Sequence, residues 1–114
     1  MNLGEIVETL FIPGVRGVSI VGVDGLEIVS KMGAGLDPEV VGALIAKTAK
    51  EIEKNLVKIE KPILVYLHTT DGRIFFEVAE SFIVVVVANR DVNAGAVRLK
   101  LQRVLPFIEE MLSS

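Results

Sequence analysis

The chain has 114 residues, no cysteine, one histidine and a formal net charge of −3, and 51% of its residues are hydrophobic while only 5% are aromatic. This length predicts one domain, 1–114; the missing cysteines exclude disulfides and fit a cytoplasmic location, and the lone His68 argues against a histidine-based zinc site. The acidic balance argues against binding to nucleic acid, the longest apolar run, 82–88, is too short to span a bilayer, and residues 1–12 lack the basic start of a signal peptide.

The first predicted element is a helix over residues 3–11. Apolar side chains recur there at positions i, i+3, i+4, i+7 and i+8, which is the spacing of one helical face. Pro13-Gly14 then ends the pattern, because proline cannot continue a helix and glycine favours a turn.

A β-hairpin is predicted next, in the segment GVSIVGVDGLEIVSK at residues 17–31. Two apolar runs flank Asp24-Gly25, and a two-residue Asp-Gly loop favours a type I′ turn, in which both central residues have positive φ. That turn fixes the register of the two strands. The expected pairs are Val23 with Leu26, Val21 with Ile28, Ile20 with Val29, Ser19 with Ser30 and Val18 with Lys31.

A long helix is predicted to begin at Asp37-Pro38 and to run to about Lys58. Asp37 is suited to the N-cap and Pro38 to the first helical position, and Glu39 places a carboxylate near the positive end of the helix dipole. The main apolar stripe is expected to contain Val41, Leu44, Ile45, Thr48, Ile52 and Leu56. A basic stripe lies opposite, at Lys47, Lys50, Lys54 and Lys58. It is interpreted as a solvated face, with contact to an acidic partner as the alternative.

Three strands follow, over residues 63–69, 73–79 and 82–88, joined by turns at Asp71-Gly72 and Glu80-Ser81. The four valines at 84–87 show no alternation, which is typical of a strand buried on both faces, so this strand is expected at the centre of the sheet. A last helix is predicted to start at Asp91 or Asn93. The order α-β-β-α-β-β-β-α predicts an α+β fold, a five-stranded antiparallel sheet with helices on both faces.

Three segments of the sequence resemble the roadblock family. They are IPGVRGVSIVGVDGLEIVSK at 12–31, DPEVVGALIAK at 37–47 and NAGAVRLKLQRVL at 93–105, and the match covers nearly the whole chain in the right order. The family includes dynein light chains of roadblock type and prokaryotic regulators of small Ras-like GTPases. The resemblance implies a roadblock/longin-profilin-like fold with strand 63–69 at the sheet edge and strand 82–88 inside. It also implies a non-enzymatic homodimer built from that edge strand and the long helix.

The expected dimer interface combines the edge strand with one flank of the long helix. Strand 63–69 is apolar on both faces and has no charge or internal proline, so a bare edge of this kind would be prone to aggregate. A second strand is therefore expected to pair with it, through Ile63, Val65 and Leu67. On the helix, a row of small side chains would let another helix approach closely, at Gly42, Ala46 and Ala49. The alternative for this row is close packing onto the chain's own sheet.

No catalytic, cofactor-binding or metal-binding residue is predicted. Gly33-Ala-Gly35 precedes a helix, but Asp37 already occupies the cap with a negative charge, so a plain loop is expected rather than a phosphate cradle. His68 has no evident acid partner in the sequence. Arg16 and Arg90, both expected in loops, could each offer a guanidinium to a GTPase transition state, but the resemblance supplies no finger arginine at either position.

The predicted function is that of a non-enzymatic, homodimeric adaptor or regulator that binds a small Ras-like GTPase or scaffolds a larger complex. Regulation is expected to act by positioning the switch loops of the GTPase itself. One alternative is a profilin- or PAS-like domain that binds a small ligand between sheet and helix, although the low aromatic content argues against it. Another is a purely structural subunit of a motor or membrane-tethered complex.

Overall fold

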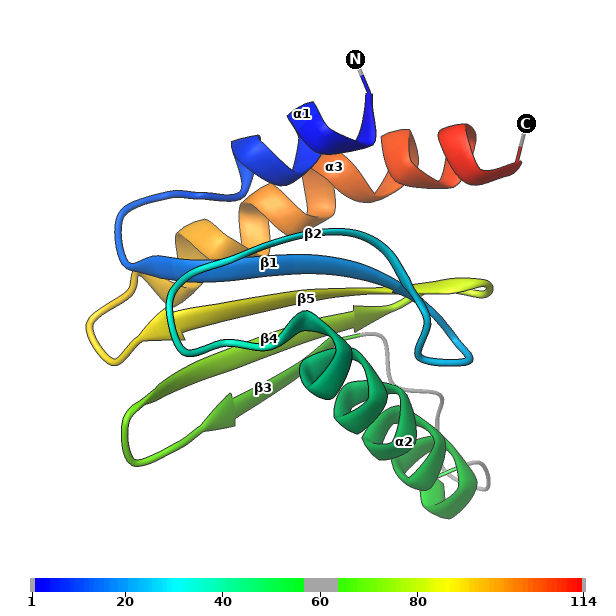
Figure 1. Ribbon diagram of the computed structural model, residues 1–114, viewed down its shortest axis with the longest axis horizontal. Helices are drawn as coiled ribbons and strands as arrows, with labels where there is room; N and C mark the ends of the chain where they lie inside the picture. The colour runs from blue at the N-terminus through cyan, green and yellow to red at the C-terminus, as the bar shows by residue number, and fades with distance from the viewer. Residues whose placement is uncertain (1, 57–63, 114) are drawn as a thin grey trace.

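The computed structural model describes residues 2–56 and 64–113, which form three helices and five strands (Figure 1). In chain order they are α1 (Leu3–Thr9), β1 (Val15–Gly22), β2 (Glu27–Met32), α2 (Pro38–Leu56), β3 (Leu64–His68), β4 (Gly72–Val78), β5 (Phe82–Asn89) and α3 (Ala94–Ser113). The predicted order of elements is confirmed. The strands form one antiparallel sheet in the order β2-β1-β5-β4-β3, with β3 at an edge and β5 at the centre, as the resemblance implied.

Helices cover both faces of the sheet, as predicted. α1 and α3 lie together on one face and α2 crosses the other (Figure 1). The buried residues accordingly form two clusters, one beneath α1 and α3 and one beneath α2. β5 contributes to both, with Val84 and Val86 in the first cluster and Val85 and Val87 in the second. The unbroken valine run thus reflects a strand that is covered on each side by helices.

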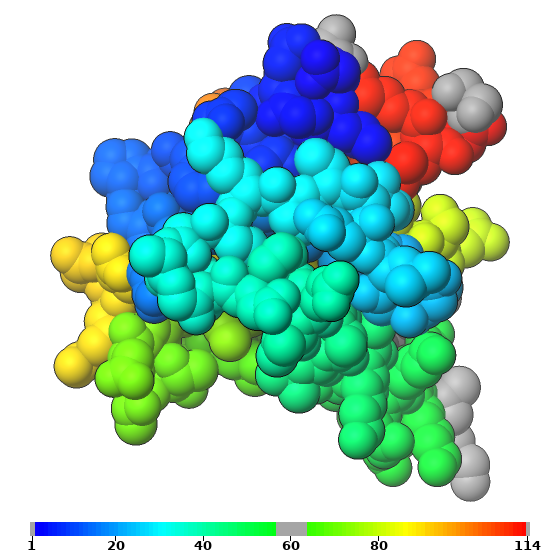
Figure 2. All heavy atoms as spheres, in the orientation of Figure 1, coloured from blue at the N-terminus to red at the C-terminus, as the bar shows by residue number. Residues whose placement is uncertain are grey.

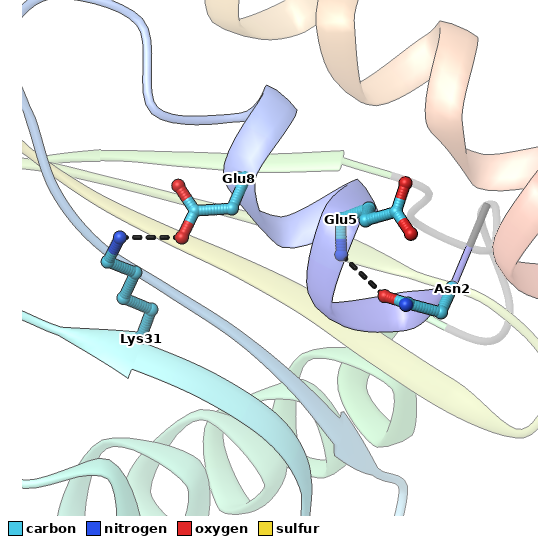
Figure 3. A network of polar contacts seen from close by, with 4 residues as sticks. All are labelled: Asn2, Glu5, Glu8 and Lys31. Atoms are coloured by element: carbon cyan, nitrogen blue, oxygen red, sulfur yellow. Dashed lines mark hydrogen bonds and ion pairs between the residues drawn. The ribbon is translucent and has the colours of Figure 1, made fainter.

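One polar contact caps α1 and another connects it to β2 (Figure 3). At its start, the Asn2 Oδ1 atom accepts a hydrogen bond from the Glu5 N–H at 2.8 Å, which caps the helix. Towards its end, the Lys31 ammonium group on β2 forms an ion pair with Glu8 at 2.5 Å and lies 5.4 Å from the centre of the Phe11 ring. Since both charged side chains are exposed, this ion pair contributes more to the placement of α1 over β2 than to stability.

α2 begins at the cap that the sequence predicts, and α3 begins at one of the two starts that the sequence left open. The Asp37 carboxylate accepts a hydrogen bond from the Glu39 N–H at 3.0 Å, and the Asn93 side chain accepts one from the Ala96 N–H at 3.0 Å. Asn93 is thus the cap of α3. Residues 33–35 form the predicted loop between β2 and α2. The predicted end of α2 near Lys58 lies outside the described residues.

The β1–β2 hairpin differs from the prediction in its turn. Gly25 has a φ of +87°, but no non-glycine residue in the described ranges has a positive φ, so Asp24 does not adopt the conformation that a type I′ turn needs. The Gly22 carbonyl accepts a hydrogen bond from the Gly25 N–H at 2.9 Å, and the Gly22 N–H donates to the Leu26 carbonyl at 2.9 Å. The turn is therefore a three-residue loop that ends in a left-handed glycine and a bulge.

The three-residue loop shifts the register next to the turn by one residue, and a bulge at the step between Ile20 and Val21 shifts it back. Val21 is opposite Glu27 rather than Ile28, and Leu26 bonds to residue 22, so the predicted pairs of Val21 with Ile28 and Val23 with Leu26 are wrong. The physical reason is local, because the Asp24 carboxylate accepts a hydrogen bond from the Leu26 N–H at 3.0 Å and holds the turn in this form. The pairs beyond the bulge are confirmed, namely Ile20 with Val29, Ser19 with Ser30 and Val18 with Lys31.

Candidate interaction surface

One backbone edge of β3 pairs with no strand among residues 2–56 and 64–113. The strand has a single neighbour in the sheet, β4. Just beyond the strand, the Thr69 N–H donates to the Gly72 carbonyl at 3.0 Å, which marks a hydrogen-bonded pair. Such pairs alternate with non-bonded pairs along an antiparallel ladder. The backbone groups that point to the free edge are consequently those of Leu64, Tyr66 and His68.

The side chains of this edge strand are apolar and partly exposed. Tyr66 and Leu67 are each 37% exposed, and Val65 packs against the core cluster beneath α2. The Tyr66 ring stacks on Phe75 of β4, with the ring centres 4.4 Å apart. Leu64–His68 contains no lysine, proline or bulge, although edge strands in natural proteins are generally protected by such features. These are the properties of an edge strand that is open to pairing with a further strand.

The row of small residues on α2 faces the interior of the chain. Ala46 and Ala49 are 5% and 7% exposed and belong to the core cluster beneath α2. A Cβ atom added to Gly42 would lie 3.0 Å from the Gly25 carbonyl oxygen and 3.1 Å from the Val21 Cγ1 atom. In Figure 2 the β1–β2 turn, in light blue, lies against the first half of α2. The structure thus favours the alternative for this row, close packing onto the chain's own sheet and turn.

Other apolar residues of α2 face outward. The exposed ones are Val40 (62%), Leu44 (59%) and Leu56. The predicted stripe therefore divides, because Ile45 is buried, Val41 and Ile52 pack at the margin of the core, and Leu44 extends beyond it. Successive helical residues are about 100° apart, so Leu44 shares a flank with Val41 and lies away from Gly42, which meets the β1–β2 turn. This outward flank is on the side of α2 away from the β1–β2 turn.

The basic stripe of α2 is accessible. Lys47, Lys50 and Lys54 are all exposed, whereas Lys58 lies outside the described residues. The second half of α2, in green, extends past the sheet in both views (Figure 1, Figure 2). The lysines are therefore placed where another protein could contact them.

No family model matches the sequence, but archaeal relatives do. The uncharacterised protein MJ0714 of Methanocaldococcus jannaschii is 31% identical over 105 residues, which cover 86% of this chain and 85% of that protein. The uncharacterised protein MJ0310 of the same organism is 29% identical over 100 residues, covering 86% of this chain and 88% of its own length. The chain belongs to the same family as MJ0714.

Solved structures identify the fold. A Roadblock/LC7 domain from Streptomyces avermitilis has a TM-score of 0.88 at 15% identity, with 100% of both chains covered. MglB from Myxococcus xanthus has a TM-score of 0.81 at 14% identity, covering 96% of this chain and 89% of that one. Profilin IB from Acanthamoeba castellanii has a TM-score of 0.66 at 14% identity, covering 94% and 96%. The fold is the roadblock fold, and the resemblance in the sequence is confirmed at this level.

Within this roadblock fold, Glu77 on β4 is a buried carboxylate that the sequence analysis did not single out. It is 5% exposed, and its Oε2 atom accepts no hydrogen bond from any described residue. Burial raises the pKa of Glu77, and the negative charge of Glu109 on α3 raises it further. The signal in the sequence is a charged residue two positions after Phe75, on the face of β4 that packs beneath α3.

The remaining polar candidates form no catalytic arrangement in the described part of the roadblock chain. Ser19 and Ser30 are cross-strand neighbours whose hydroxyl groups share a hydrogen bond of 2.6 Å. His68 is exposed on β3, and Arg90 is exposed after β5. Arg16 lies in β1 and not in the predicted loop. Across residues 2–56 and 64–113, no cluster of three or more acidic or histidine side chains could hold a metal, and no helix has the length and apolar character to cross a membrane.

Proposed function

We propose that this chain forms a non-enzymatic homodimer that binds a small Ras-like GTPase, as an adaptor or a regulator. The observation that carries the proposal is the free edge of β3, an apolar strand without a protective charge, and the exposed apolar residues Val40 and Leu44 of α2 support it. The roadblock fold supports it, since the sequence resembles a family that contains homodimeric regulators of such GTPases.

The proposed interface differs in part from the one predicted from the sequence. Val65 and Leu67 remain in it, on the face of β3 that α2 covers. Ile63, predicted alongside them, lies outside the described residues. The row of small residues on α2 packs within the chain. The proposed interface therefore contains Leu44, on the outward flank of α2, instead of these residues.

The outward backbone groups restrict how two β3 strands can pair. Only residues whose N–H and C=O point to the free edge can form hydrogen-bonded pairs. A two-fold antiparallel arrangement centred on Tyr66 pairs Leu64 with the partner's His68 and keeps all five strand residues in the ladder. Centring the pairing on Val65 or Leu67 leaves fewer of these five residues paired. The arrangement centred on Tyr66 is therefore the proposed one.

Such a dimer has its two copies of α2 on the same face of one continuous sheet, because its two-fold axis runs perpendicular to the sheet. The exposed Lys47, Lys50 and Lys54 of each copy then offer a basic surface to an acidic patch on a partner. A GTPase held there would be regulated through the position of its own switch loops.

Two measurements test the proposal. Sedimentation at micromolar concentrations should give a dimer, and amide exchange should show protection of β3. A small Ras-like GTPase from the same organism, loaded with GDP or with a non-hydrolysable GTP analogue, is then passed over the immobilised chain. Preferential recovery of the GTP form supports a regulator, and equal recovery supports a purely structural subunit. Recovery of neither form counts against GTPase binding.

A small-ligand function has one supporting observation, the similarity of the fold to that of profilin IB. The inner faces of the sheet are filled mainly by aliphatic and phenylalanine side chains, which leaves few polar groups to orient a ligand. A thermal denaturation midpoint that rises with a panel of nucleotides, but not with a GTPase, would support this alternative.

A further inference from the structure

Glu77 lies one strand away from the free edge, and its carboxylate has an unsatisfied oxygen. The residue is 5% exposed, and its Oε2 atom accepts no hydrogen bond from residues 2–56 or 64–113. In the β3–β4 ladder it is opposite Leu64. A buried carboxylate oxygen without a hydrogen bond is costly, so its presence calls for a partner from outside the described chain.

The proposed register supplies a candidate partner. When two β3 strands pair about Tyr66, the residue opposite Leu64 is the partner's His68. The alternation of side chains places Glu77, Leu64 and that histidine in one row on the same face of the sheet. Strands are about 4.8 Å apart, so the Cα atoms of the two outer residues are about 10 Å apart. Each of their side chains reaches about 4–5 Å from its Cα, so the two can meet over the leucine.

We propose that the imidazole of the partner's His68 bonds to the Glu77 carboxylate in the dimer, so that each chain satisfies the buried acid of the other. The inference rests on the proposed homodimer and names a contact that selects its register. The two-fold axis produces the contact twice. In pairings centred on Val65 or Leu67 the histidine is no longer in the same row, so those registers lose the contact.

The titratable groups around Glu77 favour a cation from a second chain. α3 supplies Glu109, a second negative charge, and the buried residues of β5 are all apolar. On the same strand, Arg73 is held at the β3–β4 turn, where its Nη1 atom donates to the carbonyl of the preceding residue at 2.7 Å. From β3 of the same chain come Tyr66, which stacks on Phe75, and His68, which is opposite Arg73 at the far end of the strand. A protonated imidazole from the partner therefore meets negative charge.

Sedimentation equilibrium of the full chain tests the contact as a double-mutant cycle at pH 6 and pH 8. The variants are Glu77→Gln, His68→Gln and the double substitution. Imidazole groups ordinarily gain a proton below about pH 6.5. At pH 6 each single variant should raise the dimer dissociation constant about fivefold, and the double variant should be no weaker than either single one. Glu5→Gln, an exposed carboxylate on α1, is the matched control and should leave the constant unchanged.

A second variant keeps the test decisive if Glu77→Gln folds poorly. Residue 68 is exposed, and the variant His68→Lys has a positive charge at both pH values. The parent chain is expected to form a tighter dimer at pH 6 than at pH 8. His68→Lys should keep the dimer at pH 8 and remove this expected difference.

The outcomes separate this contact from the dimer itself. Additive effects in the double variant, or a pH dependence that is the same in the parent and in His68→Lys, would overturn the contact and leave the homodimer standing. A chain that stays monomeric at both pH values would overturn the contact together with the proposed function.

Discussion

Gly42 of α2 lies so close to Gly25 of the β1–β2 turn that a Cβ atom on Gly42 would be 3.0 Å from the Gly25 carbonyl oxygen. The positive φ of Gly25, +87°, lets the turn fold back against the helix. The long helix therefore approaches the turn at contact distance. The row of small residues on this helix packs inside the chain.

Enlarging Gly42 should therefore destabilise the folded chain. Gly42→Leu should lower the free energy of unfolding by about 1–3 kcal/mol, because overpacking at so close a contact forces its neighbours apart. Urea denaturation measures the effect. Ala43→Leu, the next residue and an exposed one, is the matched control and should change this free energy by less than about 0.5 kcal/mol. If Gly42→Leu instead loses the dimer while its free energy of unfolding is unchanged, the small residues of α2 belong to the dimer interface.

A charge on the free edge should separate the two copies. Leu67→Lys, on β3, should raise the dimer dissociation constant at least about tenfold, which corresponds to about 1.4 kcal/mol, because lysine on an edge strand opposes pairing. Ile28→Lys makes a comparable change on the opposite edge strand, β2, where the side chain is also partly exposed. Sedimentation velocity compares the two variants. Equal dimer affinity in both would rule out β3 as the interface.

Protonation of Glu77 should stabilise a single chain. Burial raises the pKa of this carboxyl above its ordinary value of 4.5, so the folded chain binds the proton more readily than the unfolded chain. The resulting stabilisation is complete below about pH 4.5 and is lost as the pH rises through the raised pKa. In a monomeric background such as Leu67→Lys, Glu77→Gln should remove this loss. It should exceed its parent in stability by about 1–3 kcal/mol at pH 7.5.

Urea denaturation from pH 4 to pH 7.5 follows this difference. Glu5→Gln, in the same background, controls for the removal of a carboxylate that is exposed. Curves of the free energy of unfolding against pH that run parallel for Glu77→Gln and its parent would show that Glu77 is not the titrating group.

Two polar contacts that reach β2 should differ in their effect on stability. Ser19 is fully buried and shares a 2.6 Å hydrogen bond with Ser30, so Ser19→Ala should cost about 1 kcal/mol. The ion pair between Glu8 and Lys31 is exposed, so Glu8→Gln should cost less than about 0.5 kcal/mol. Thermal denaturation can rank the two, and an equal loss from both would contradict this reasoning.

The order of the elements could be predicted because each element has a local signal. The cap at Asp37 and the unbroken apolar run of β5 depend only on neighbouring residues, and both were found in the sequence. The Asp24-Gly25 turn was predicted wrongly, because the same dipeptide fits a two-residue turn and a three-residue loop with a bulge. The hydrogen bond from the Gly22 N–H to the Leu26 carbonyl decides between them, and no sequence pattern reveals it.

The interaction surface was predictable only in part, because it depends on tertiary packing. Helical spacing places Leu44 and Ile45 in the same apolar stripe. It does not show that the sheet buries Ile45 and leaves Leu44 exposed. Strand alternation places Glu77 on the same face as Phe75, but only the position of α3 shows that this face is closed over the carboxylate. The place of strand 63–69 at the sheet edge was implied by the resemblance to the roadblock family, and the uncharged apolar sequence then indicated that such an edge needs a partner strand.

The opposite edge of the sheet, β2, bears on the size of the proposed assembly. When β3 pairs with its twin, the outermost strands of the combined sheet are the two copies of β2. That strand carries Glu27 and Lys31, lies next to α1, and adjoins the bulge near Val21. Charges and a bulge discourage the addition of another strand, so we expect the proposed dimer not to extend into a longer sheet or a fibre.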